Sequence, residues 1–331
     1  MPENTAMKYI VYILILLFGL SISYAQDREL VLVKSFPDET SEKKGDFLAH
    51  PFEVEIYNGQ YYVTDADDGC IKVFDREGAF VRQIGRKGTG PGELFDPYCF
   101  TVDHATGEIY CQDQGSARIA VFNPDGTYKL GILPVSGLHD IIIYNNLVIT
   151  SQFSTTGPNF KVYDRSGKLI SEFGVLNDDK ISKLLYARYI YGDVVFSVMD
   201  DTLYVLYQDL PIIQVYSVGG IYYREIPVKD KAIQSVYEHN INPNKVLKKN
   251  NRFELRKWFF SALSSDGFFY AHQSTGDSDI IYVIDRNGRI QNRFYIRKES
   301  SYFLRLGAIQ NGDFVFTDIF NAKIKVYRER E

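Results

Sequence analysis

The chain has 331 residues, of which 45% are hydrophobic and 24% are charged, and this balance excludes an intrinsically disordered chain. Its formal net charge of −5 gives no basic surface of the kind that binds nucleic acid or anionic lipid, so neither is an expected partner. The 25 tyrosines and 23 phenylalanines, against one tryptophan, favour a protein rich in β-strands, whose half-buried surfaces suit these rings.

The first 25 residues have the composition of an export signal. Lys8 precedes an apolar run at 9–22, and Ser23 and Ala25 then supply small residues at the two positions that a signal peptidase reads. We therefore predict cleavage after Ala25, with Met7 as a candidate functional start.

This segment also sets the expected location of the protein. The apolar run is shorter than the roughly 20 residues that span a bilayer, so a cleaved signal is favoured over an uncleaved membrane anchor. No cysteine lies directly after the run, and a lipid anchor is therefore not expected. The mature chain 26–331 is predicted to be periplasmic or secreted, without membrane insertion after cleavage.

Six copies of one short pattern run through the rest of the chain. Each copy alternates apolar residues in the period of a β-strand, and five of them continue into a turn that ends in glycine, as tight hairpins do. The copies are CIKVFDREG at 70–78, RIAVFNPDG at 118–126, NFKVYDRSG at 159–167, IIQVYSVGG at 212–220, IIYVIDRNG at 280–288 and KIKVYRER at 323–330.

The spacing of the copies predicts the fold. Positions equivalent to Asp75 recur after 48, 41, 53, 68 and 43 residues, which is room for four short strands with their turns. Four antiparallel strands repeated six times predict an all-β chain, a single six-bladed β-propeller at 26–331. The approximate repeats are 51–85, 97–133, 138–174, 189–228, 258–297 and 302–331, with an insertion at 229–257.

The ends of the repeat array predict how the ring closes. The sixth repeat stops at Glu331, directly after its third strand, whereas the strand-like segment 29–36 has no repeat of its own. An unpaired sheet edge is a liability that proteins cover. We therefore expect 29–36 to complete the last blade.

The unit at 74–126 resembles an NHL-type propeller repeat, and the mature chain resembles the secreted six-bladed propellers common in Bacteroidota. The segment IGRKGTGPGELFDP at 84–97 is similar to the connection between blades in that family, whereas the third, fourth and fifth repeats lack it. The resemblance implies the fold. Because such propellers serve as lyases, lactonases, sensor domains and binding platforms, it implies no single function.

Two segments look like ligand loops but lack the required order. In the glycine-rich segment 84–97, Lys87 precedes Gly88 and a strand follows, whereas a phosphate loop needs a terminal lysine and a helix. We interpret it as a joint between blades, with Phe95 filling the wedge. The acidic segment 65–69 lacks the glycine and glutamate positions of a calcium loop. The aspartates at the ends of second strands are instead expected to cap turns: Asp65, Asp113 and Asp318.

Cysteines and histidines give no metal motif. Cys70, Cys99 and Cys111 form no CxxC pair and are expected to be buried thiols, with one bridge between Cys99 and Cys111 as the alternative. His50, His139 and His272 fall in alternate repeats, and some lyases that resemble this fold hold zinc with histidines over the channel. Their unlike strand positions argue against convergence on one ion. No cofactor is predicted, and a calcium or zinc ion in the channel stays the alternative.

The expected ligand face is the one where the inner strands begin and the loops gather around the channel. Aromatic residues with a few charges there suit an unidentified glycan, peptide or protein, so the sequence predicts a binding or interaction module. The alternative is a propeller enzyme, a metal-dependent lyase or lactone hydrolase, although no nucleophile stands at a recognisable spacing from a base. The candidate ligand-binding residues are Glu53, Tyr98, His139, Asp140, Arg188, Tyr189, Tyr207, Trp258, His272 and Arg305.

The insertion is the main departure from the repeat. Its segment KAIQSVYEHN predicts one helix, and its many lysines and arginines favour a solvated flap over one face. A lid or a docking arm for a partner is the alternative, because insertions in repeat proteins often lie on the binding face.

Overall fold

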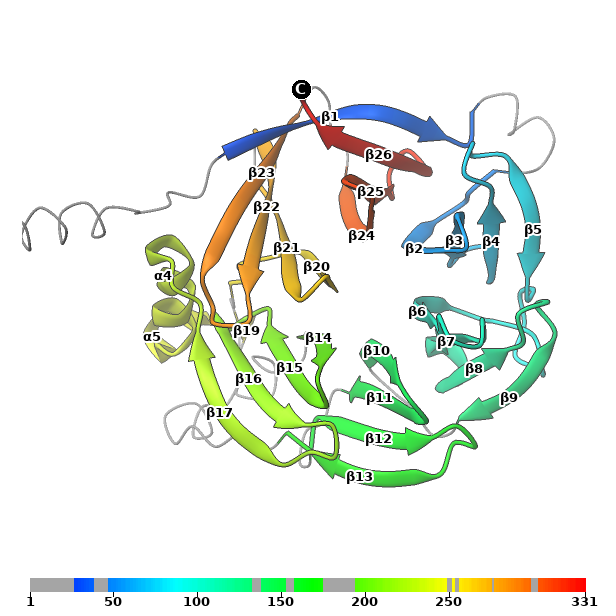
Figure 1. Ribbon diagram of the computed structural model, residues 1–331, viewed down its shortest axis with the longest axis horizontal. Helices are drawn as coiled ribbons and strands as arrows, with labels where there is room; N and C mark the ends of the chain where they lie inside the picture. The colour runs from blue at the N-terminus through cyan, green and yellow to red at the C-terminus, as the bar shows by residue number, and fades with distance from the viewer. Residues whose placement is uncertain are drawn as a thin grey trace, which may run out of the picture.

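The computed structural model describes residues 27–38, 47–132, 138–152, 158–174, 194–248, 252–253, 256–275, 277–298 and 303–331. These residues form six blades of four antiparallel strands, arranged in a ring (Figure 1). In each blade the first strand lies nearest the axis and the fourth lies at the rim. The predicted six-bladed β-propeller is confirmed.

The first three blades follow one another directly in the chain. Blade 1 contains β2 (Pro51–Tyr57), β3 (Gln60–Asp65), β4 (Cys70–Phe74) and β5 (Phe80–Ile84). Blade 2 contains β6 (Pro97–Val102), β7 (Ile109–Asp113), β8 (Arg118–Phe122) and β9 (Tyr128–Ile132), with the short 3-10 helix η1 (Gln114–Ser116) after β7. Blade 3 contains β10 (Leu138–Tyr144), β11 (Leu147–Gln152), β12 (Phe160–Asp164) and β13 (Leu169–Phe173).

The remaining blades enclose the insertion and use the N-terminal strand. Blade 4 contains β14 (Val194–Met199), β15 (Thr202–Tyr207), β16 (Ile212–Ser217) and β17 (Tyr222–Pro227). Blade 5 contains β20 (Ser261–Ser265), β21 (Phe268–Ser274), β22 (Ser278–Asp285) and β23 (Ile290–Arg297). Blade 6 contains β24 (Leu304–Gln310), β25 (Asp313–Asp318), β26 (Lys323–Glu329) and, from the other end of the chain, β1 (Asp27–Phe36).

Closure by the N-terminal strand is confirmed and extends further than expected. β1 pairs antiparallel with β26, from Leu30 opposite Glu329 to Phe36 opposite Ile324. Its first three residues also pair in parallel with β23. Blades 5 and 6 therefore form one eight-stranded sheet with β1 at its centre.

The hydrophobic core is divided among the junctions between blades. The described residues form six clusters of buried side chains, and each cluster takes its members from two adjacent blades. Leu30 of β1 lies in the cluster between blades 5 and 6, and Phe36 lies in the cluster between blades 6 and 1. Each blade is thus stabilised by both of its neighbours.

The predicted hairpin turns also serve the junctions. Gly78 has φ +91°, a left-handed conformation that disfavours other residues. A Cβ atom at this position would lie 2.6 Å from Cγ of Phe36. The glycine therefore forms the turn and also admits the ring that closes the propeller.

The glycine-rich segment forms the predicted joint, but the residue that fills the wedge is different. Leu94 is fully buried in the cluster between blades 1 and 2, and its backbone N–H donates to the Arg86 carbonyl. Phe95, the residue expected in the wedge, is 49% exposed. The guanidinium of Arg118 also secures the joint by donating to the carbonyls of Gly90 and Glu93.

The aspartates at the ends of second strands cap turns, as predicted. Asp65 accepts hydrogen bonds from the backbone N–H groups of Ala49 and His50, both at 2.8 Å. Asp113 accepts in the same way from Phe95 and Asp96 in the next joint. A carboxylate therefore fixes the chain as it enters each of these blades.

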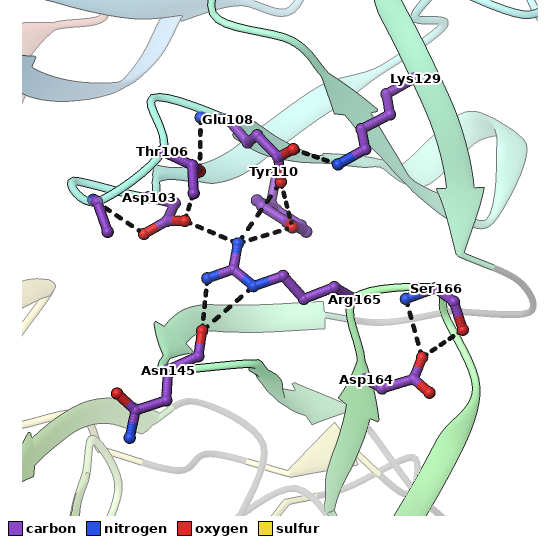
Figure 2. Close-up of polar contacts among 10 residues, drawn as sticks. Asp103, Thr106, Glu108, Tyr110, Lys129, Asn145, Asp164, Arg165 and Ser166 are labelled. Atoms are coloured by element: carbon purple, nitrogen blue, oxygen red, sulfur yellow. Dashed lines mark hydrogen bonds and ion pairs between the residues drawn. The ribbon is translucent and has the colours of Figure 1, made fainter.

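A polar network joins blades 2 and 3 (Figure 2). Arg165, in the turn after β12, donates from Nη1 to Asp103 Oδ2 at 2.7 Å and to the Tyr110 hydroxyl at 3.2 Å. Burial raises the pKa of Asp103, but hydrogen bonds from Thr106 and Arg165 outweigh it and hold that pKa below its usual value. The network is a brace between two blades.

The insertion contains the predicted helix, but this helix is packed and not solvated. α4 (Lys231–Asn240) is followed by α5 (Pro243–Val246) and a small hairpin of β18 (Leu247–Lys248) and β19 (Arg252–Phe253). Ile233 and Val236, three positions apart on α4, are buried in the cluster between blades 4 and 5. The prediction of a solvated flap rested on the charged residues of the insertion and overlooked the apolar face of this helix.

Several expectations concern parts of the chain beyond the described residues. The predicted signal segment 1–25 lies outside them, as do Arg188 and Tyr189. Within the described ranges, no helix is long and apolar enough to cross a membrane. The three cysteines are buried and free, so the alternative of a bridge between Cys99 and Cys111 is wrong.

Candidate functional site

A cavity of 410 Å³ lies at the axis, where the inner strands of the blades begin. All six blades contribute to its wall. A second cavity of 400 Å³ shares Glu53, Asp140 and Val195 with the first and continues along the inner strands. The two cavities are therefore successive sections of one channel.

Equivalent positions of the six blades form the wall of the first cavity. In four blades the lining residue of the inner strand pairs with the same position of the second strand. These residues are Asp140, Val195, Ser261 and Arg305. In blades 1 and 2 the inner strand bulges at this level, and Glu53 and Cys99 line the cavity there. The repeat thus places one inner-strand side chain from each blade in a single ring around the axis.

The ring contains one close ion pair. Arg305 Nη2 lies 3.0 Å from Glu53 Oε2, and both side chains are about one-fifth exposed, at 19% and 18%. The guanidinium also lies over the ring of Phe52, 4.5 Å from its centroid. Its Nε is buried and has no hydrogen-bond partner among the described residues. This pair joins the last blade to the first.

Asp140 is a second carboxylate of the ring, and its environment disfavours ionisation. Burial raises its pKa to about 7, and the charge of Glu53 adds to this effect. Backbone N–H groups of Phe196 and Ile141 donate to its two oxygens and act in the opposite direction. Because Phe196 belongs to blade 4, Asp140 also holds two inner strands together.

One buried amide oxygen at the cavity wall lacks a partner. Gln208, directly after β15, is 5% exposed, and its Nε2 donates to the carbonyl of Phe260 at 3.1 Å. Its Oε1 has no donor among the described residues. Such an acceptor costs about 1–3 kcal/mol until a donor reaches it.

Aromatic rings lead from the cavity to the surface. Phe260 lines the cavity, and its ring contacts Phe303 with centroids 4.4 Å apart. Phe303 in turn contacts Phe320 at 5.5 Å, and Phe320 is 73% exposed. On another side of the cavity, Phe52 and Tyr98 pack edge to face at 4.4 Å. The channel mouth is therefore aromatic at two places.

The structure brings four of the predicted site residues together and places three others in the core. Glu53, Tyr98, Asp140 and Arg305 line the cavity. The three buried residues are no more than 1% exposed: Tyr207, Trp258 and His272.

The buried residues have structural partners. Trp258 donates from Nε1 to the carbonyl of Tyr207 at 2.8 Å, and the Tyr207 hydroxyl donates to Gln214. His272 lies between Ser261 and Asp279, with 3.1 Å to each. Arg188 and the side chain of His139 lie outside the described residues.

Sequence reasoning missed Gln208, Phe260 and Ser261, all of which line the cavity. Gln208 follows a second strand and Ser261 begins an inner strand, which are the positions expected to face the channel. Residue type hid them, because a glutamine and a serine carry less specific chemistry than a histidine. Within the described residues, no group of three or more His, Cys, Asp or Glu side chains could hold a metal ion.

Comparisons with known proteins agree with the architecture. Residues 39–252 match the model of a family described as a six-bladed β-propeller. Among solved structures, a DUF4221 family member from Bacteroides vulgatus is 13% identical with a TM-score of 0.58, over 93% of this chain and 99% of that one. A Bacteroides fragilis protein predicted to be exported is 12% identical with a TM-score of 0.55, over 92% and 99%.

Enzymes are also among the structural neighbours. A streptogramin B lyase is 12% identical with a TM-score of 0.56, over 91% of this chain and 98% of that one. At such low identity these likenesses establish the fold alone. Comparison with curated proteins finds no match.

Proposed function

The chain belongs to the DUF5128 family of six-bladed β-propellers, and on that premise we propose that it is an exported binding module for a glycan held at the channel mouth. Export is supported by the signal-type segment 1–25 and by the Bacteroides fragilis neighbour that is predicted to be exported. The ring of six blades is the scaffold, and the ligand enters where the inner strands begin.

The observation that carries the proposal is the mixture of chemistry at the cavity wall. Gln208 contributes an amide group and Arg305 contributes a guanidinium to this wall. A ligand that supplies both donors and acceptors suits both groups. Sugar hydroxyl groups do this, and the carboxylates of Glu53 and Asp140 add further acceptors for them.

The aromatic rings support the same class of ligand. Sugars present apolar C–H faces between their hydroxyl groups, and flat aromatic rings offer matching apolar surface. The row from Phe260 through Phe303 to Phe320 extends from the cavity outward, so it favours an oligosaccharide over a monosaccharide.

The proposal is tested by thermal-shift screening of the purified mature protein against linear and branched oligosaccharides. A specific ligand at 100 times its Kd stabilises the fold by about 2.7 kcal/mol, which raises the Tm. Phe320→Ala is expected to weaken binding of the best oligosaccharide about two- to tenfold, from the loss of about 0.5–1.5 kcal/mol of ring stacking.

Ile221→Ala is the matched control, because Ile221 is 68% exposed on the outer hairpin of blade 4. It is expected to bind like the unchanged protein. A screen in which peptides shift the Tm and oligosaccharides do not would replace the glycan with a peptide or protein partner. Stoichiometric zinc or calcium in the purified protein would favour the metal-dependent lyase or lactonase instead.

A further inference from the structure

Three side chains on neighbouring strands of blade 5 form a continuous polar chain that starts at the channel wall. Ser261 begins β20 and lines the cavity, His272 lies opposite it on β21, and Asp279 lies on β22. Ser261 Oγ is 3.1 Å from His272 Nδ1, and His272 Nε2 is 3.1 Å from Asp279 Oδ1. All three residues are at most 3% exposed.

The surrounding hydrogen bonds indicate which atoms of Ser261, His272 and Asp279 carry protons. An ionised Asp279 can only accept, so His272 carries its proton on Nε2 and leaves Nδ1 as an acceptor. Lys298 Nζ lies 3.7 Å from Asp279 Oδ1. The backbone N–H of Leu306 donates to Ser261 Oγ at 2.9 Å, so the serine proton is directed to His272 Nδ1.

Two other blades have a threonine, and no imidazole, at the position that His272 occupies in blade 5. Thr64 and Thr317 occupy the position of His272 in blades 1 and 6, and their hydroxyls donate to backbone carbonyls of the next blade. Asp279 is fully buried, and its Oδ2 has no partner among the described residues. A buried carboxylate with an unpartnered oxygen is costly, which points to a role beyond packing.

We infer that Ser261 is a nucleophile activated by His272 and oriented through Asp279, and that the protein hydrolyses a small carboxylic ester in this cavity. The roles are those of a serine–histidine–aspartate triad, with the two ring nitrogens exchanged. The inference goes beyond glycan binding and stands independently of it. The 410 Å³ cavity limits the substrate to a small ester.

The reaction balances with water as the only co-reactant. Ser261 Oγ forms a bond to the ester carbonyl carbon while its proton passes to His272 Nδ1. The carbon–oxygen bond to the alcohol then breaks, and the alcohol leaves with that proton. Water, deprotonated by His272, attacks the acyl-serine and releases the carboxylic acid, which restores the serine hydroxyl.

A cationic residue of the ring lines the same cavity as the nucleophile. Arg305 lies on the adjacent inner strand, directly before Leu306, and lines the same cavity. Donors that meet a developing oxyanion in a shielded site lower the barrier.

The test uses a fluorophosphonate probe, which labels activated serines, together with hydrolysis of p-nitrophenyl acetate. Intact mass is expected to show one adduct on the unchanged protein and none on Ser261→Ala. Ser171→Ala is the matched control, because Ser171 lies on β13, the outermost strand of blade 3, away from the channel. It is expected to keep both labelling and hydrolysis.

Two further variants separate chemistry from folding. His272→Gln removes the base and is expected to lower kcat by roughly 10²- to 10⁴-fold. Asp279→Asn changes a positioning residue, and it is expected to lower kcat while leaving KM unchanged. Ser261→Cys is expected to transfer labelling from the fluorophosphonate to iodoacetamide, which keeps the test valid if Ser261→Ala does not fold.

Absence of any adduct on the folded unchanged protein would overturn the inference. Equal labelling of the unchanged protein and Ser261→Ala would overturn it as well. Because the oligosaccharide screen measures Tm and not labelling, either proposal can fail while the other stands.

Discussion

Asp140 is a carboxylate that holds its proton near neutral pH in the wall of the channel. Burial raises its pKa to about 7, against about 3.9 in an unfolded chain. Between these two values the folded protein binds more protons than the unfolded one. Linkage then requires that folding stability from this group is fully present below pH 4 and is lost as pH rises through 7.

Replacement of this carboxyl group is therefore expected to flatten the pH dependence of stability. Asp140→Asn should show a smaller fall in Tm between pH 5 and pH 8 than the unchanged protein, measured by circular dichroism. Asparagine retains one oxygen that can accept from Phe196 N–H. Glu77→Gln is the control, since Glu77 is 63% exposed and should leave the slope unchanged. Equal slopes for all three proteins would contradict the assignment.

Single residues of the site were predictable where strand position decides orientation. Glu53, Asp140 and Arg305 lie near the starts of inner strands, and the alternation of a strand turns them toward the axis. Tyr207 and His272 lie on second strands, whose side chains face adjacent blades and are fully covered there. Residue type alone could not reveal this difference.

At the scale of elements, α4 is held to the ring by a buried amide as well as by its apolar face. Asn240 is fully buried, and its Nδ2 donates to the carbonyls of Asp209 and Arg256, both at 2.8 Å. Its Oδ1 accepts from the backbone N–H of Arg256 at 2.9 Å. The helix thus ties the start of the insertion to its end.

Removal of this amide should loosen the insertion. Asn240→Ala leaves buried backbone groups without partners and is expected to cost about 1–3 kcal/mol in the free energy of unfolding. Urea denaturation measures this loss. Lys231→Ala, an exposed position on the same helix, should stay within about 0.5 kcal/mol of the unchanged protein. A loss of the same size in both variants would refute the anchoring role.

Elements were predicted well where pattern and turn chemistry agree. The five repeated hairpin turns and the helix Lys231–Asn240 appear where the sequence pattern indicates them. The joint at 84–97 was also identified, but Leu94 and not Phe95 fills the wedge. In a glycine-rich segment no strand or helix period fixes the direction of a side chain, so the sequence could not show which residue fills the wedge, and packing decided it.

At the scale of the whole molecule, stability depends on the strand that closes the ring. Leu30 is 2% exposed between blades 5 and 6, whereas Leu32 on the same strand is 50% exposed. Leu30→Ala is expected to cost about 2–5 kcal/mol, from lost burial and the cavity left behind. Leu32→Ala serves as the control, and urea denaturation compares the two. Equal stabilities would mean that β1 does not support closure.

The repeat itself determined the number of blades, the strands in each blade and the closing role of the N-terminal strand. These properties follow from local alternation and turn residues, which a single sequence displays directly. Only the tertiary structure decided the contents of the channel. Arg305 and Glu53 are 252 positions apart in the sequence. The hydrogen-bonded residues Ser261, His272 and Asp279 lie on three separate strands. These residues come into contact because the ring closes and the strands pair in register. Neither ring closure nor strand register can be read from a local sequence pattern.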